Sequence, residues 1–120
     1  MTEAKKILVV DDDRQVVKYL TEVLQDSGYE TIACQRFQDA KTFLAEGRPD
    51  LLLTDIRLGV YNGLQLAIFA RDRHPGIPII VLTGYEDPTL REEAVHSGAL
   101  FLVKPVPRET LLGAVRQALA

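Results

Sequence analysis

The sequence is poor in the residues that build disulfide-stapled or thiolate-metal proteins. It contains one cysteine, one methionine and no tryptophan among 120 residues. A single cysteine, Cys34, excludes an internal disulfide and a multi-cysteine metal site, and its simplest interpretation is a small buried hydrophobic residue. No apolar run approaches the roughly 20 residues that span a bilayer, and acids interrupt the opening segment too soon for a signal peptide. We therefore predict a soluble, cytoplasmic protein with no membrane contact.

The sequence also lacks a block of basic residues. Its 14 Lys and Arg are outnumbered by 17 Asp and Glu, which gives a net charge of −3. This balance argues against a nucleic-acid-binding surface in this chain. The length fits one domain, residues 1–120, and a chain of this size can bury an adequate core.

Short apolar runs alternate with helical patterns along the chain. Four runs have strand length and are apolar throughout, which is typical of strands covered on both faces: residues 7–10, 51–53, 79–82 and 100–103. A weaker candidate, residues 29–34, mixes Glu30 and Thr31 with apolar residues and suits a sheet edge. Apolar spacing predicts helices at residues 16–24, 37–45, 64–73, 88–97 and 111–119. The alternation predicts a doubly wound α/β fold, with five parallel strands and five helices.

The predicted helix at residues 88–97 has few apolar residues to hold it. Only Leu90, Ala94 and Val95 are available to face the sheet. We expect it to be the least firmly packed helix of the domain.

Polar and charged residues follow four of the predicted strands. They are Asp11, Asp12 and Asp13 after the first, Thr54 and Asp55 after the third, Thr83 after the fourth and Lys104 after the fifth. Because the carboxyl ends of parallel strands share one edge of a sheet, these side chains should converge there. Clustered carboxylates repel unless a hard divalent cation lies among them, and an all-oxygen donor set suits Mg²⁺, with Mn²⁺ as a substitute.

A set of motifs in a fixed order resembles the receiver domains of two-component response regulators, of which the chemotaxis regulator is the best known. The motifs are ILVVDDD, LLLTDIRL, NGLQL, VLTG and LVKPV, within a match that runs from about Lys6 to Leu119. The resemblance implies a flavodoxin-like sheet with strand order 2-1-3-4-5. It also implies a sensor histidine kinase or a histidine phosphotransfer domain as partner.

The resemblance assigns roles to particular residues of this sequence. Asp55 is implied as the phosphoacceptor, and Asp11, Asp12, Asp55 and the backbone carbonyl of Arg57 as the protein ligands of Mg²⁺. Thr83 and Lys104 are implied to bind the phosphoryl group. Phe101 matches the aromatic residue that changes rotamer on activation, although its apolar neighbours equally suit a plain core residue. The peptide bond before Pro105 is expected to be cis, since X–Pro is where a cis bond is energetically accessible.

The sequence departs from the family pattern in the loop after the phosphoacceptor position. Receivers often carry Met-Pro where this chain has Leu58-Gly59, and Gly59 together with Gly63 suggests a more mobile loop. The side chain of Arg57 falls where it can block or guide a hydrolytic water. Asp13 is predicted to be the N-cap of the first helix and not a metal ligand.

The leading hypothesis is a phosphorylation-operated signalling switch that catalyses only its own phosphorylation and dephosphorylation. Its output would be a changed affinity of the face from Pro88 to Leu119 for an effector domain or protein. Dimerisation through the last helices stays open, as does the choice between a stand-alone regulator and part of a longer one. Alternatives are a Mg²⁺-dependent phosphohydrolase with an aspartate nucleophile, a flavodoxin-like cofactor binder, and a receiver-like module that is never phosphorylated. Gln15 and the acidic first loop argue against the hydrolase and the cofactor binder, respectively.

Overall fold

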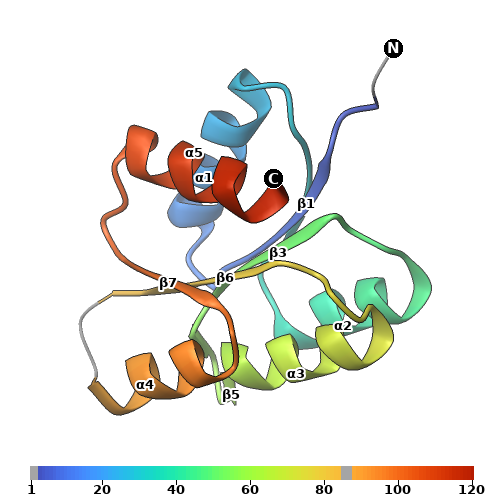
Figure 1. The fold of residues 1–120 in the computed structure, drawn as a ribbon, viewed down its shortest axis with the longest axis vertical. Helices are drawn as coiled ribbons and strands as arrows, with labels where there is room; N and C mark the ends of the chain where they lie inside the picture. The colour runs from blue at the N-terminus through green and yellow to red at the C-terminus, as the bar shows by residue number, and fades with distance from the viewer. Residues whose placement is uncertain (1–2, 85–87) are drawn as a thin grey trace.

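The computed structural model describes residues 3–84 and 88–120, and the other residues of the predicted domain 1–120 lie outside the described part. Five parallel strands form one sheet in the order β2-β1-β3-β6-β7, flanked by five helices (Figure 1). The strands are β1 (Lys6–Val10), β2 (Glu30–Cys34), β3 (Leu51–Asp55), β6 (Ile79–Thr83) and β7 (Leu100–Val103). The helices are α1 (Arg14–Asp26), α2 (Phe37–Glu46), α3 (Gly63–Arg73), α4 (Pro88–His96) and α5 (Arg108–Leu119). The predicted fold class and strand order are confirmed.

The core lies in two layers because each central strand is covered on both faces. Successive side chains of a strand point to opposite faces, so Ile7 and Val9 pack with α1 and α5, whereas Leu8 and Val10 pack with α2, α3 and α4. Every residue of β3 and β6 is buried. This double burial explains why their sequences are continuous apolar runs and not alternating patterns.

Helix ends follow local sequence signals. The Asp13 side chain accepts a hydrogen bond from the Gln15 backbone N–H at 2.9 Å and caps α1, as predicted. Asn62 caps α3 in a reciprocal capping box with Gln65. Gly28 and Gly98 follow α1 and α4 with positive φ angles of 92° and 81°, a conformation that favours glycine.

Three details differ from the sequence-based prediction. The run of residues 100–103 is not buried on both faces, because β7 is an edge strand and its residues are only half-buried or exposed. Val95 does not anchor α4, since 60% of its surface is exposed, and Ala94 is the buried residue of that helix. A small antiparallel hairpin, β4 (Arg57–Leu58) and β5 (Tyr61–Asn62), stands where a loop was expected.

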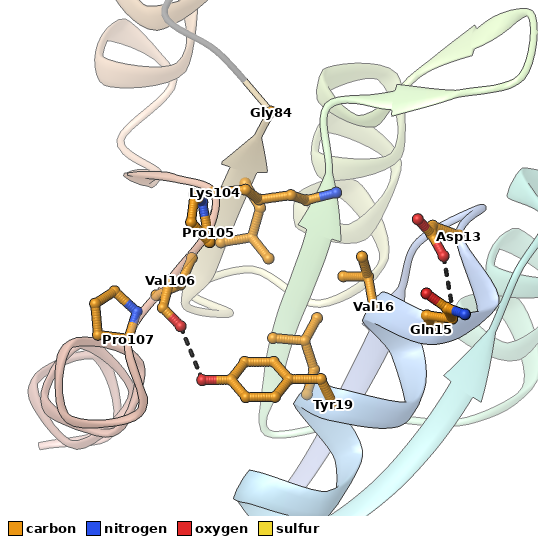
Figure 2. Close-up of a pocket in the computed structure, with 11 residues that line it drawn as sticks. Asp13, Gln15, Val16, Tyr19, Gly84, Lys104, Pro105, Val106 and Pro107 are labelled. Carbon is orange, nitrogen blue, oxygen red and sulfur yellow. Dashed lines mark hydrogen bonds between the residues drawn. The ribbon is translucent and has the colours of Figure 1, made fainter.

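A cavity of about 600 Å³ separates α1 from the segment that joins β7 to α5 (Figure 2). Its apolar lining includes Val16, Leu20 and Leu82. The Tyr19 side chain extends from α1 toward the segment on the other side. The pocket interrupts the packing between the helix and the segment, although Leu20 and Val106 both belong to the buried core on this side of the sheet.

Two valines on helix surfaces provide a matched test of this packing. Val23 in α1 is 5% exposed and Val95 in α4 is 60% exposed. Val23→Ala removes buried methyl groups and is expected to lower the free energy of unfolding by about 2 kcal/mol, whereas Val95→Ala should change it by less than about 0.5 kcal/mol. Urea denaturation followed by circular dichroism measures both. Equal losses from the two variants would contradict the assigned orientation of α4.

Candidate functional site

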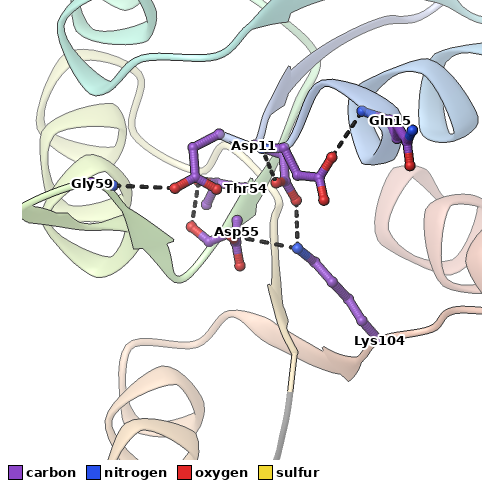
Figure 3. Close-up of polar contacts among 8 residues, drawn as sticks. Asp11, Gln15, Thr54, Asp55, Gly59 and Lys104 are labelled. Carbon is purple, nitrogen blue, oxygen red and sulfur yellow. Dashed lines mark hydrogen bonds and ion pairs between the residues drawn. The ribbon is translucent and has the colours of Figure 1, made fainter.

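The carboxyl ends of four strands gather the predicted polar residues at one rim of the sheet (Figure 3). Asp11 follows β1, Asp55 is the last residue of β3, Thr83 is the last residue of β6, and Lys104 follows β7. Asp11, Asp55 and Thr83 are buried, with exposures of 0%, 6% and 2%. Because β3 lies between β1 and β6, Asp55 occupies the centre of this rim.

Lys104 reaches across the rim to two carboxylates. Its Nζ lies 2.6 Å from Asp11 Oδ2 and 3.4 Å from Asp55 Oδ2. The Lys104 side chain is only 18% exposed. A partly buried ammonium at these distances compensates charges that burial would otherwise make very unfavourable.

The acids after β1 point in three different directions. Asp11 also accepts a hydrogen bond from the backbone N–H of Asp13 at 2.9 Å. Asp12 is exposed and lies 3.4 Å from the backbone nitrogen of Gly59, at the tip of the hairpin. The side chain of Asp13 instead accepts the hydrogen bond from the Gln15 backbone and caps α1 (Figure 2).

The environment of Asp55 disfavours its ionised form. Burial, and after it the charge of the nearby Asp11 carboxylate, raises the pKa of Asp55 to about 6, although Lys104 and a hydrogen bond from the Arg57 backbone oppose the rise. For Lys104, burial lowers the pKa, but the hydrogen bond to Asp11 and the charge of Asp55 outweigh it, so the pKa ends above its ordinary value. At neutral pH the site therefore holds ionised Asp55 beside a protonated lysine.

The donor set of the rim fits a hard divalent cation. One carboxylate oxygen from each of Asp11, Asp12 and Asp55 lies within 4.8 Å of the others. Oxygen donors of this kind suit Mg²⁺ or Mn²⁺, because the single charge of Lys104 does not balance three acids. The assignment of the Arg57 carbonyl as a further ligand stays a prediction, although the structure places Arg57 at the start of the adjacent hairpin.

The remaining predicted residues lie on the side of the rim next to β7. Thr83 and Lys104 are linked by a backbone hydrogen bond of 2.7 Å from Lys104 N to Thr83 O. The peptide bond between Lys104 and Pro105 is cis, the conformation that the resemblance implies. Phe101 is half-buried against the layer of α2, α3 and α4, and the Arg91 guanidinium lies 5.7 Å from its ring centroid. Whether Phe101 changes rotamer stays a prediction.

Sequence reasoning missed how the start of α3 holds the end of strand β3. The Gly63 N–H donates to the Ile56 carbonyl at 2.7 Å, and a Cβ at residue 63 would overlap the carbonyl oxygen of Asp55. The start of α3 therefore packs directly on the backbone of Asp55. The NGLQL motif contains this glycine, but a close approach between backbones leaves no other mark in the sequence.

Comparison with known proteins identifies the family. The model of the response regulator receiver domain matches residues 7–116, nearly the whole chain. The chain belongs to the response regulator receiver domain family. This match favours the receiver interpretation over the hydrolase and flavodoxin-like alternatives.

The receiver domain is similar to parts of longer regulators. It is 35% identical over 119 residues to the DNA-binding response regulator MtrA of Mycobacterium tuberculosis H37Rv, covering 98% of this chain and 52% of that protein. It is 30% identical to the C4-dicarboxylate transport transcriptional regulatory protein DctD of Pseudomonas aeruginosa, covering 95% of this chain and 25% of that protein. The chain thus spans about half or a quarter of the length of these relatives.

Solved structures share the whole fold of this receiver domain. The CheY-like receiver domain protein of Methanospirillum hungatei JF-1 has a TM-score of 0.91 at 28% identity, covering 97% of this chain and 94% of that one. The beryllofluoride-activated NtrC4 receiver domain dimer has a TM-score of 0.89 at 25% identity, covering 95% of each chain. Receiver domains are signalling domains with an acidic pocket for Mg²⁺, and the cluster of three acids described above corresponds to such a pocket.

In the receiver domain without Mg²⁺, Asp55→Asn is expected to stabilise the fold. The pKa of Asp55 rises from 3.8 to about 6 on folding, so the fold penalises the ionised carboxylate. This penalty is complete above about pH 6 and absent below about pH 4. The variant should gain up to about 3 kcal/mol in free energy of unfolding near pH 8, and the gain should vanish toward pH 4.

Urea denaturation across this pH range, in the presence of a chelator, measures the gain. Asp26→Asn, at an exposed position in α1, controls for the effect of an added amide. A gain that stayed constant with pH would contradict the proposed burial penalty at Asp55.

Proposed function

We propose that the chain is a phosphorylation-operated signalling switch of a two-component system, with Asp55 as the phosphoacceptor. The observation that carries this proposal is the convergence of Asp11, Asp12 and Asp55 with Lys104 on one rim. The donor is the phosphohistidine of a sensor histidine kinase or of a histidine phosphotransfer domain. The family match supports a signalling domain of this class.

The chemistry is an in-line phosphoryl transfer to a carboxylate. An oxygen of the Asp55 carboxylate forms a bond to phosphorus while the bond between phosphorus and the imidazole nitrogen breaks, and the electron pair stays on that nitrogen. The product is an acyl phosphate on Asp55 and a free histidine on the donor. Asp55 reacts as the ionised form, which the raised pKa of about 6 still allows at neutral pH.

The charges of the rim stabilise the transferred group. Asp11, Asp12 and Asp55 would hold Mg²⁺, which when bound supplies positive charge for the phosphoryl oxygens. Lys104 Nζ, 3.4 Å from Asp55 Oδ2, is placed to move from the carboxylate to a phosphoryl oxygen. The hydroxyl of Thr83, at the end of the neighbouring strand, is the hydrogen-bond donor that the same group would attract.

The output is a change on the side of β7 and α4. The phosphoryl group adds roughly −1.5 to −2 charge beside Thr83, and Phe101 turns inward as Thr83 moves toward the group. Helix α4 is the bistable element, because Ala94 is the one residue between Pro88 and His96 that is buried. Few buried apolar contacts therefore hold this helix in one position. The face from Pro88 to Leu119 then changes its affinity for an effector domain or protein.

Downstream partners are proposed from the relatives alone. MtrA is described as DNA-binding and is about twice as long as this chain. An effector domain of this kind would act through the face from Pro88 to Leu119, with no direct contact of the receiver domain to nucleic acid. The beryllofluoride-activated NtrC4 receiver domain is a dimer, which makes a homodimer a further option for this chain. We place the protein in the cytoplasm, and no helix within the described residues is long and apolar enough to cross a membrane.

Intact-mass spectrometry after incubation with acetyl phosphate tests the phosphoacceptor. We expect one added phosphoryl group, dependent on Mg²⁺, in the wild type and none in Asp55→Asn. Asp13→Asn is the matched control, because Asp13 caps α1 and Asn is an equally good cap, so this variant should be phosphorylated. The proposal would be contradicted if Asp55→Asn were phosphorylated. It would also be contradicted if neither acetyl phosphate nor a phosphohistidine donor phosphorylated any of the three proteins.

Amide hydrogen exchange tests the output. Beryllofluoride, which substitutes for the phosphoryl group, is expected to change exchange rates several-fold in α4 and β7 and to leave α2 unchanged, since α2 packs on the far end of the sheet. Asp55→Asn should show no change on addition of beryllofluoride. Wild-type protein with identical exchange in α4 before and after addition would rule out this helix as the switch element.

A further inference from the structure

One hydrogen bond joins two segments of the chain that carry the opposite charges of the site. The Tyr19 hydroxyl of α1 donates to the backbone carbonyl of Val106 at 2.9 Å, across 87 positions of sequence (Figure 2). Helix α1 begins directly after the acids that follow β1, and Val106 lies two residues after Lys104. The bond therefore links the acid-bearing segment to the lysine-bearing segment.

Backbone hydrogen bonds hold the segment that carries Lys104 at both ends, from the Lys104 N–H to the Thr83 carbonyl at 2.7 Å and from the Leu111 N–H to the Pro107 carbonyl at 3.0 Å. The Tyr19 bond holds Val106 between them. Pro105 and Pro107 have no N–H to donate. Val106 is 6% exposed, so its carbonyl needs a partner inside the protein. Tyr19 supplies that partner.

Packing between the two segments is incomplete, although Leu20 and Val106 belong to the same hydrophobic core. The cavity of about 600 Å³ lies between them, with Val16 on the side of α1 and Pro105 on the opposite side. Tyr19 itself is 41% exposed, so its ring contributes less burial than a core residue would. The hydrogen bond of the Tyr19 hydroxyl adds a directional constraint to the packing of the two segments.

From these observations we infer that Tyr19 is a positioning residue for phosphoryl transfer, acting through Lys104. The inference rests on the proposed function. Lys104 Nζ reaches Asp11 at 2.6 Å and Asp55 at 3.4 Å from a backbone that is held by Thr83 at Lys104 and by Tyr19 at Val106. Loss of the bond lets the segment after Lys104 shift into the cavity and moves the ammonium away from the reacting carboxylate. Rates of group transfer fall when a charge-stabilising group is displaced from the reacting atoms, even by a small distance.

A double-mutant cycle isolates this effect. Tyr19→Phe removes the hydroxyl and keeps the ring, and Tyr29→Phe is the matched control, since Tyr29 is half-buried in the same core layer. Both changes are made in the wild type and in Lys104→Gln. Phosphorylation rates are measured with acetyl phosphate, and amide resonances of Lys104 and Val106 are recorded by NMR in the unphosphorylated, metal-free proteins.

The expected result is specific to Tyr19 and depends on Lys104. Tyr19→Phe should slow phosphorylation roughly threefold to tenfold and shift the amide resonances of Lys104 and Val106, while Tyr29→Phe does neither. In the Lys104→Gln background, Tyr19→Phe should cause no further loss of rate. A merely structural role would instead lower the rate by the same factor in both backgrounds.

Three outcomes separate this inference from the proposed function. A wild-type protein that accepts no phosphoryl group overturns the proposed function. A wild type that reacts, with Tyr19→Phe reacting equally fast, overturns only the role of Tyr19. A loss of rate that persists undiminished in Lys104→Gln shows that Tyr19 does not act through Lys104 and also overturns the inference.

Discussion

The attraction between one lysine and two buried acids is the interaction on which the rest of the site depends. Three carboxylates within 4.8 Å of one another would repel strongly in a partly dry environment. Lys104 lies 2.6 Å from the most deeply buried of them, Asp11, and thereby makes that burial tolerable. It leaves Asp55 only partly compensated, as the raised pKa of that group shows. The domain thus keeps an unbalanced negative charge at the centre of its rim, which a divalent cation would neutralise.

The parallel sheet is what brings these charges together. Asp11, Asp55 and Lys104 are far apart in the sequence, yet β1 and β3 pair directly, and β7 follows β6 at the same edge. The strands end at the same edge of the sheet, so the side chains of Asp11, Asp55 and Lys104 can contact one another directly. Burial of β3 on both faces removes the freedom of its backbone, and the close packing of Gly63 on Asp55 fixes its last residue.

Most of the fold, and the set of polar residues that meet at the rim, could be predicted from the sequence. Continuous apolar runs identify β1, β3 and β6 because both faces of these strands are buried, and the polar residues behind them mark the rim. The hairpin β4–β5 could not be predicted, since two-residue strands have no periodicity. The exposure of Val95 could not be predicted either, because α4 offers three apolar residues and only the packed structure shows which of them faces inward. The bond from Tyr19 to Val106 depends on a backbone carbonyl, which every residue possesses and no motif reveals.

The position of β7 at the open edge of the sheet has a mechanical consequence. Strand β3 has neighbours on both sides, and so any displacement of its backbone would strain two ladders of hydrogen bonds. Among the described strands, β7 is hydrogen-bonded only to β6, and its residues are half-buried or exposed. The sheet is therefore stiff where Asp55 sits and compliant where Phe101 sits. A change of charge at the stiff centre would be relieved toward this compliant edge, because Lys104, which follows β7, carries the positive charge that faces Asp55.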